Sequence, residues 1–158
     1  MITHKPLLVG FGVAPTGKSC EEVANGVVCS ARERFSNGVG FDLHDEETKV
    51  LKTIQTETLE IAVEDRGQAH GKSVILLHGF PDDPRSWDGV VELLTAAGFR
   101  TLAPYLRGFG PTRFLHAHTL RSGQQGALAY DLNGLIDGLK LQQPILVGYD
   151  WGARAACT

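Results

Sequence analysis

Apolar and polar positions follow a regular pattern from about residue 53 to the end of the chain. Alternation over 53–67 predicts two strands joined by a turn. Uninterrupted apolar runs predict three strands buried on both faces, at 73–79, 99–106 and 144–150. Apolar residues at helical spacing predict a helix after each of the first two strands, with Trp87, Val90, Val91 and Leu94 in one and Leu128, Leu132, Leu135, Ile136 and Leu139 in the other. The residues "WGARAACT" after the third strand would begin another helix. Strands that alternate with helices form right-handed βαβ units, so the predicted fold class is α/β with a mostly parallel sheet.

Capping residues mark the ends of the predicted helices. Asp83 and Pro84 fit the cap and the first position of the first helix. Gly98 is expected to end that helix. Ser122 and Gln125 have the spacing of a capping box, which predicts that the second helix starts there.

The chain changes character near 36–50, where a polar, turn-rich and locally acidic stretch is typical of a linker. Before it, the residues "KPLLVGFGV" suggest a strand that is followed by a loop and a short helix. We therefore predict two parts, an unassigned N-terminal extension at 1–48 and an α/β core at 49–158.

Composition excludes several classes of protein. The 158 residues are 42% hydrophobic and 21% charged, with a net charge of −3, and they contain no Lys/Arg run, so nucleic acid is not an expected partner. No apolar run reaches the roughly 20 residues of a membrane span, so no membrane association is expected. The cysteines Cys20, Cys29 and Cys157 have no CxxC spacing, which favours free thiols in the cytoplasm over a disulfide framework or a metal site.

The residues "VGYDWG" near the end of the chain carry the main candidate chemistry. Gly148 and Gly152 flank Asp150 at a predicted strand-to-helix junction, and small flanking residues allow such a turn to be tight. An aspartate there is ionised at neutral pH, so its carboxylate can act as a nucleophile without a base to activate it. The simpler alternative is that Asp150 only caps the helix that follows.

Residues 52–158 resemble the N-terminal half of an α/β-hydrolase of the epoxide hydrolase and haloalkane dehalogenase branch. Four stretches carry the resemblance: "HGFP" (78–81), 86–110, 121–128 and 147–156. The resemblance implies an incomplete α/β-hydrolase core, with flanking helices and without a cap domain. It also implies a small-molecule substrate, an epoxide first and a haloalkane as the alternative, and it implies no cofactor.

The same resemblance assigns roles to residues. Asp150 would be the nucleophile that forms an aspartyl ester, and the backbone N–H groups of Phe80 and Trp151 would form the oxyanion hole. His78 and Arg107 would be structural. In epoxide hydrolases, tyrosines of the cap protonate the opening epoxide.

The partners that complete this chemistry in the family are not found in the sequence. The family's general-base histidine comes late in the chain, whereas all six histidines here precede Asp150. We therefore expect no turnover by this chain alone, and an inactive fragment or an interaction module is an alternative. The strand at 144–150 would become an exposed, apolar edge of the sheet, which would favour self-association.

The N-terminal extension offers a different function. Gly12–Ser19 match the P-loop pattern G-x-x-x-x-G-K-[ST], in which Lys18 would contact the phosphates of a nucleotide. Residues 4–31 also weakly resemble the late strands of the tryptophan synthase α-chain, whose loops bind phosphate. We favour an extension without activity of its own, and nucleotide binding remains the alternative.

Overall fold

The structure is a computed structural model that describes residues 8–10 and 50–158. The strands within this part of the chain are β1 (Leu8–Gly10), β2 (Val50–Gln55), β3 (Leu59–Gly67), β4 (Ser73–Leu77), β5 (Arg100–Pro104), β6 (Arg113–Phe114) and β7 (Ile145–Gly148). The helices are the 3-10 helix η1 (Pro84–Trp87) and the α-helices α1 (Asp88–Ala96), α2 (Gln125–Gly138) and α3 (Trp151–Cys157). None of the described helices is long and apolar enough to cross a membrane.

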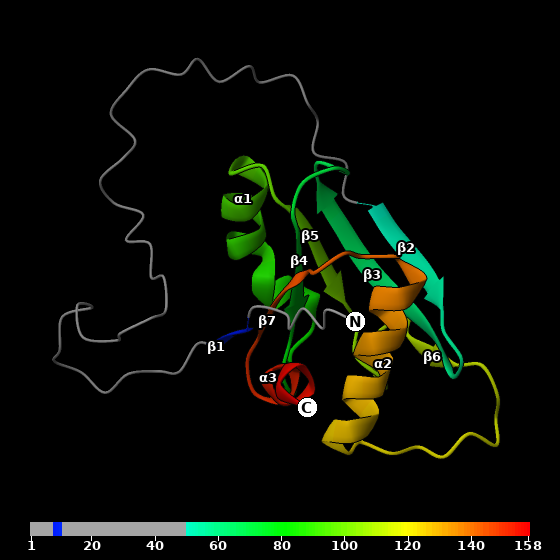
Figure 1. Cartoon of the computed structure of the whole chain (residues 1–158). Helices are drawn as coiled ribbons and strands as arrows, with labels where there is room; N and C mark the ends of the chain where they lie inside the picture. The colour runs from blue at the N-terminus through cyan, green and yellow to red at the C-terminus, as the bar shows by residue number, and fades with distance from the viewer. Residues whose placement is uncertain (1–7, 11–49) are drawn as a thin grey trace, which may run out of the picture. The chain divides into compact units, whose positions relative to one another are not determined.

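The strands form one mixed sheet in the order β1-β7-β4-β5-β3-β2, with β6 also paired to β3 (Figure 1). In this order β1, β7, β4 and β5 pair with their neighbours in parallel, whereas β3 pairs antiparallel with β5, β2 and β6. The parallel strands β4, β5 and β7 are the continuous apolar runs of the sequence, and the antiparallel pair β2 and β3 is the alternating segment. The predicted α/β fold class is confirmed.

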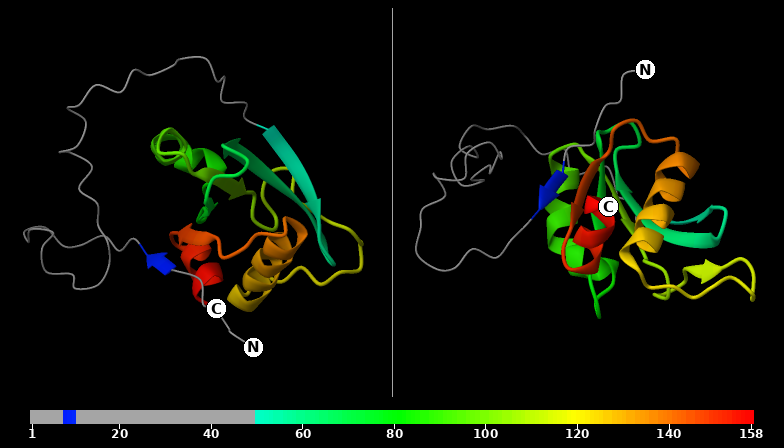
Figure 2. Two further views of the ribbon diagram at one scale, coloured as in Figure 1. Left: turned by 45° about the horizontal axis from the view of Figure 1, so that its top comes forward. Right: turned by 60° about the horizontal axis from the view of Figure 1, so that its bottom comes forward.

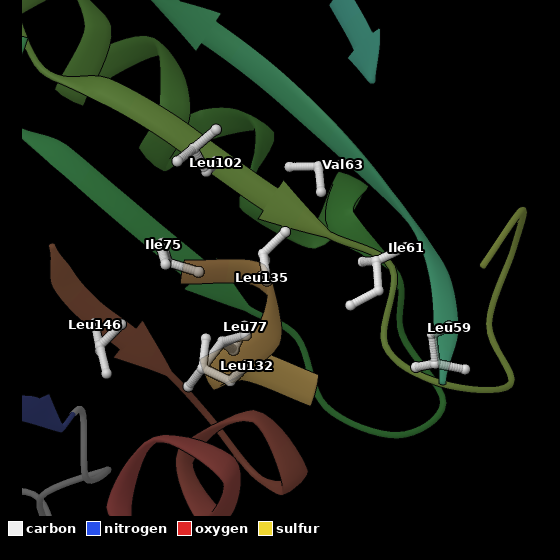
Figure 3. Packing of buried hydrophobic residues seen from close by; sticks show 9 residues of the cluster. All are labelled: Leu59, Ile61, Val63, Ile75, Leu77, Leu102, Leu132, Leu135 and Leu146. Atoms are coloured by element: carbon white, nitrogen blue, oxygen red, sulfur yellow. The ribbon is translucent and has the colours of Figure 1, made fainter. Parts of the chain in front are cut away.

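Helices cover both faces of the sheet. Residues of α2 pack on one face in a core of Leu59, Ile61, Val63, Ile75, Leu77, Leu102, Leu132, Leu135 and Leu146 (Figure 3). On the other face, residues of η1 and α1 complete a second core of Val74, Leu76, Trp87, Val91, Ala103 and Val147. Consecutive residues of β4 alternate between the two cores because successive side chains of a strand point to opposite faces. Figure 2 shows α2 and α3 side by side, and these two helices contact each other.

Two of the predicted helix signals are confirmed, and one is wrong. The Asp83 side chain caps η1 by accepting a hydrogen bond from the N–H of Arg85 (2.9 Å). Gly98 follows α1 with a φ of 85°, a conformation that glycine adopts without strain. The capping box is wrong, because Gln124 is the N-cap of α2 and makes no side-chain capping bond. Ser122 stays in the preceding loop, where its carbonyl accepts a hydrogen bond from Arg107 (2.8 Å).

The prediction that the strand at 144–150 forms an exposed sheet edge is also wrong. β7 lies between β4 and β1, and it pairs with β1 in parallel through Leu8 with Leu146, Val9 with Val147 and Gly10 with Gly148. Three residues of the N-terminal segment therefore occupy the outer edge of β7. The strand predicted in that segment is confirmed, while the predicted linker and the boundary between 48 and 49 lie outside the described residues.

Candidate active site

Asp150 lies at the junction between the end of β7 and the start of α3. Its backbone has φ 51° and ψ −120°, a conformation that residues other than glycine rarely adopt. Such strain persists only where the surrounding structure enforces it, and it is concentrated at functional sites. Asp150 occupies the N-cap position of α3, but its side chain makes no capping hydrogen bond. The interpretation of Asp150 as a simple helix cap is therefore wrong.

Close packing explains the two glycines that flank this turn. A Cβ on Gly152 would lie 2.2 Å from the carbonyl oxygen of Leu77 in β4. A Cβ on Gly148 would lie 2.7 Å from the carbonyl carbon of Gly152. Both clashes involve backbone atoms, which cannot rotate away as a flexible side chain can. Glycine at both positions lets α3 start directly against the sheet and leaves the Asp150 carboxylate exposed at the turn.

The loop after β4 brings a backbone donor to this carboxylate. The N–H of Phe80 donates to Asp150 Oδ1 at 3.0 Å, although the two residues are 70 positions apart in sequence. The loop approaches so closely that a Cβ on Gly79 would lie 2.6 Å from the Cβ of Asp150. The Phe80–Pro81 peptide bond is cis.

The backbone N–H of Trp151 is the second group that favours a charged carboxylate at Asp150. Hydrogen bonds from Phe80 and then Trp151 stabilise the charged form, so the pKa of Asp150 lies below its usual value. The structure thus brings together Asp150, Phe80 and Trp151, the three site residues that the sequence predicts. The arrangement is an ionised carboxylate held by the Phe80 N–H, with the Trp151 N–H also favouring its charge.

His78 is fully buried, and both of its ring nitrogens are hydrogen-bonded. Nε2 lies 3.1 Å from the backbone nitrogen of Leu106 and accepts its N–H, so Nδ1 carries the proton and donates to the carbonyl of Gly79 (2.9 Å). Burial lowers the pKa of His78 and keeps the ring neutral. The ring therefore fixes the loop that follows β4 and has no free nitrogen to accept a proton.

Arg107 connects the loop after β5 to α2. Its guanidinium forms a two-pronged ion pair with Asp131 at 2.6 and 2.7 Å, and both side chains are about nine-tenths buried. It also donates to the carbonyls of Ser122 and Ala127. With its donors used in this way, Arg107 acts as a structural clamp.

A cavity of about 250 Å³ lies between the loop at Phe80 and the start of α3 at Trp151. It is lined by Gly79, Phe80, Leu106, Arg107, Phe109, Gly123, Leu128 and Trp151. The Phe80 side chain is 69% exposed and that of Trp151 is 37% exposed, so two large rings face the opening. Mostly apolar walls beside a few polar groups are typical of sites for small organic molecules.

Two further kinds of site, for a metal ion and for a nucleotide, are relevant here. Within the described residues, no group of His, Cys, Asp and Glu side chains is placed to hold a metal ion. The P-loop match at Gly12–Ser19 lies outside the described residues, as does most of the 4–31 segment. Sequence reasoning missed Tyr149 and Asp82, which hydrogen-bond each other beside the site. A tyrosine next to the aspartate and a polar loop residue carry no spacing pattern that would have identified them.

A protein-family model described as alpha/beta hydrolase fold matches residues 72–158, which is more than half of the chain. The chain belongs to the α/β hydrolase fold family. The turn at Asp150 and the loop at Phe80 both lie within the matched region.

Individual relatives agree with this assignment. An epoxide hydrolase of Caballeronia sordidicola is 33% identical over 122 residues, which are 73% of this chain and 34% of the relative. Among solved structures, a Klebsiella pneumoniae protein described as a candidate epoxide hydrolase is 46% identical with a TM-score of 0.66, over 67% of this chain and 35% of that one. Epoxide hydrolase VrEH1 of Vigna radiata is 34% identical with a TM-score of 0.59, over 66% and 32%. The chain spans about a third of the length of these relatives.

Proposed function

We propose that this chain carries the nucleophile part of an epoxide hydrolase site, in which Asp150 opens an epoxide and forms an aspartyl ester. Relatives named epoxide hydrolases support the substrate class. The observation that carries the proposal is the 3.0 Å hydrogen bond from the Phe80 N–H to the Asp150 carboxylate at the strained turn. This contact holds an ionised nucleophile and a transition-state donor in one place before any substrate binds.

In the first step, the two carboxylate oxygens of Asp150 have different roles. Oδ1 is held by Phe80, so Oδ2 is the oxygen with freedom to attack. It forms a bond to an epoxide carbon while the bond from that carbon to the ring oxygen breaks. The ring oxygen takes a proton from solvent, and an ester between Asp150 and the opened substrate results. The exposed rings of Phe80 and Trp151 give the substrate an apolar surface next to this oxygen.

In the second step, water attacks the ester carbonyl carbon of Asp150. Negative charge then develops on Oδ1, the oxygen that already accepts from Phe80. The N–H groups of Phe80 and Trp151 stabilise that oxyanion without having to move. This step needs a general base to activate the water. His78 does not serve as this base, because both of its ring nitrogens are engaged. We propose that the ester lasts long enough to be detected.

The test is a mass measurement of the intact chain after incubation with styrene oxide. We expect a mass increase equal to one epoxide, located at Asp150 by peptide mapping and removed by hydroxylamine, which cleaves esters. Cys157 is exposed and its thiol also reacts with epoxides, so the experiment uses a chain in which the three cysteines are serine. A haloalkane in the same assay tests whether the site prefers the other leaving group.

Two variants make the result specific. Asp150→Asn keeps an oxygen for the Phe80 N–H but has no nucleophilic carboxylate, so it should gain no mass. Asp137→Asn removes an exposed carboxylate at the end of α2 and should react like the parent chain. A folded parent chain that gains no ester, or a gain that survives in Asp150→Asn, would refute the proposal.

A further inference from the structure

The Tyr149 side chain connects the Asp150 turn to the loop that carries the Phe80 donor. Its hydroxyl donates to Asp82 Oδ2 at 2.6 Å and lies 3.0 Å from Ser86 Oγ. One hydroxyl therefore contacts two residues that follow Phe80, Asp82 in the loop after β4 and Ser86 in η1.

We propose that Tyr149 is a positioning residue, whose hydroxyl holds the Phe80 N–H against the Asp150 carboxylate. This inference rests on the proposed function, because it concerns how the oxyanion hole of that site is kept in place.

Other contacts of the loop explain why it needs this connection. The Phe80 side chain is 69% exposed, so burial of its own ring does not anchor the donor. On the other side of the donor, the His78 ring fixes the carbonyl of Gly79 through Nδ1. After Pro81, Asp82 and then Ser86 connect the chain to the Asp150 turn, both through the Tyr149 hydroxyl. Without this hydroxyl, the donor segment would be held by His78 at the Gly79 carbonyl but released from the Asp150 turn at its far end.

Packing fixes the position of the Tyr149 ring. It packs against Trp87 with ring centroids 5.4 Å apart, and it lies so close to Gly79 that a Cβ there would be 2.9 Å from Tyr149 Cε2. Burial and then the hydrogen bond to Asp82 raise the pKa of Tyr149, so the hydroxyl keeps its proton at neutral pH and remains a donor. A rigid ring with a fixed hydroxyl therefore holds the loop at a constant distance from the end of β7.

Tyr149→Phe tests the hydroxyl alone, because the ring and its packing remain. The matched control is Tyr130→Phe, which removes another hydroxyl bonded to a carboxylate, that of Glu57, away from the site. Asp82→Ala removes the acceptor without changing the residues of the turn. It serves as the second variant if Tyr149→Phe does not fold.

Two readouts follow each variant. The first is the pKa of Asp150, measured by NMR titration of its carboxyl carbon. It should rise toward its ordinary value in Tyr149→Phe and Asp82→Ala, because the Phe80 N–H no longer lies on the carboxylate, and it should not change in Tyr130→Phe. A tyrosine that only contributes to packing would leave this pKa unchanged.

The second readout is the rate at which hydroxylamine removes the styrene oxide adduct. Loss of one oxyanion donor slows enzymes by about 10²–10³-fold. A displaced donor should slow the breakdown of the adduct by roughly tenfold, since part of the stabilisation remains. Formation of the adduct should change less than breakdown, because the attacking oxygen is not the one held by Phe80.

The outcomes separate the two proposals. An absent adduct in the parent chain refutes the proposed function, while the titration still decides the role of Tyr149. An unchanged Asp150 pKa in both folded variants refutes the positioning role, and so does adduct breakdown at the parent rate where an adduct forms.

Discussion

Gly152→Ala is the substitution that most directly tests how the Asp150 turn is built. Gly152 is the second residue of α3, and a Cβ there would lie 2.2 Å from the carbonyl oxygen of Leu77 and 2.6 Å from that of His78. Both oxygens belong to the backbone at the end of β4. The methyl group therefore has to push α3 away from the sheet, and Asp150 moves with the start of the helix.

The magnitude follows from two opposing contributions. Overpacking against atoms that cannot rotate away costs about 3 kcal/mol, at the upper end of the usual range. Alanine is better than glycine within a helix by about 1 kcal/mol. The free energy of unfolding should fall by about 2 kcal/mol, which corresponds to a melting temperature lower by roughly 4–8 °C for a chain of this size.

Gly126→Ala is the matched control. Gly126 is likewise the second residue of an α-helix, α2, but a Cβ there meets nothing within 4 Å. This variant should be unchanged or stabilised by up to about 1 kcal/mol. Urea unfolding followed by tryptophan fluorescence measures both variants. If Gly152→Ala is as stable as the parent chain, α3 does not need a glycine against β4 and the packing argument is refuted.

Three further predictions concern other parts of the chain. Val9→Pro removes a backbone donor and disfavours the pairing of β1 with β7, so light scattering should show more self-association than in the parent chain. Arg107→Ala leaves Asp131 buried without its ion pair and should lower the free energy of unfolding by about 3–5 kcal/mol in urea titrations. The lowered pKa of Asp150 means that its charged form is favoured by the fold. The contribution of this charged form to stability is present above the unfolded pKa of about 3.9 and is lost as the pH falls through the lower folded pKa. Asp150 therefore stays ionised between about pH 7 and pH 5, and ester formation measured by mass should not decline over that range.

Much of the fold could be read from local patterns. The buried strands at β4, β5 and β7 are continuous apolar runs, and β2 and β3 alternate, because the side chains of a strand point to its two faces in turn. Gly98 ends α1 where the chain needs a positive φ, which is a local requirement of one residue. The start of α2 could not be read in this way. The Ser122 carbonyl is bound by Arg107, a residue 15 positions earlier whose location depends on tertiary packing.

The candidate site shows the same division. The sequence determined that an aspartate between two glycines follows a buried strand, and resemblance named Phe80 and Trp151 as its neighbours. The backbone strain at Asp150, the approach of the Phe80 N–H over 70 residues and the contacts of Tyr149 with the loop depend on how β4, β7 and α3 pack together. The edge of the sheet is a similar case, because Leu8–Gly10 pair with β7 from the far end of the sequence. Residue types and their periods are local properties that a sequence states directly, whereas contacts between distant segments exist only once the tertiary structure has formed.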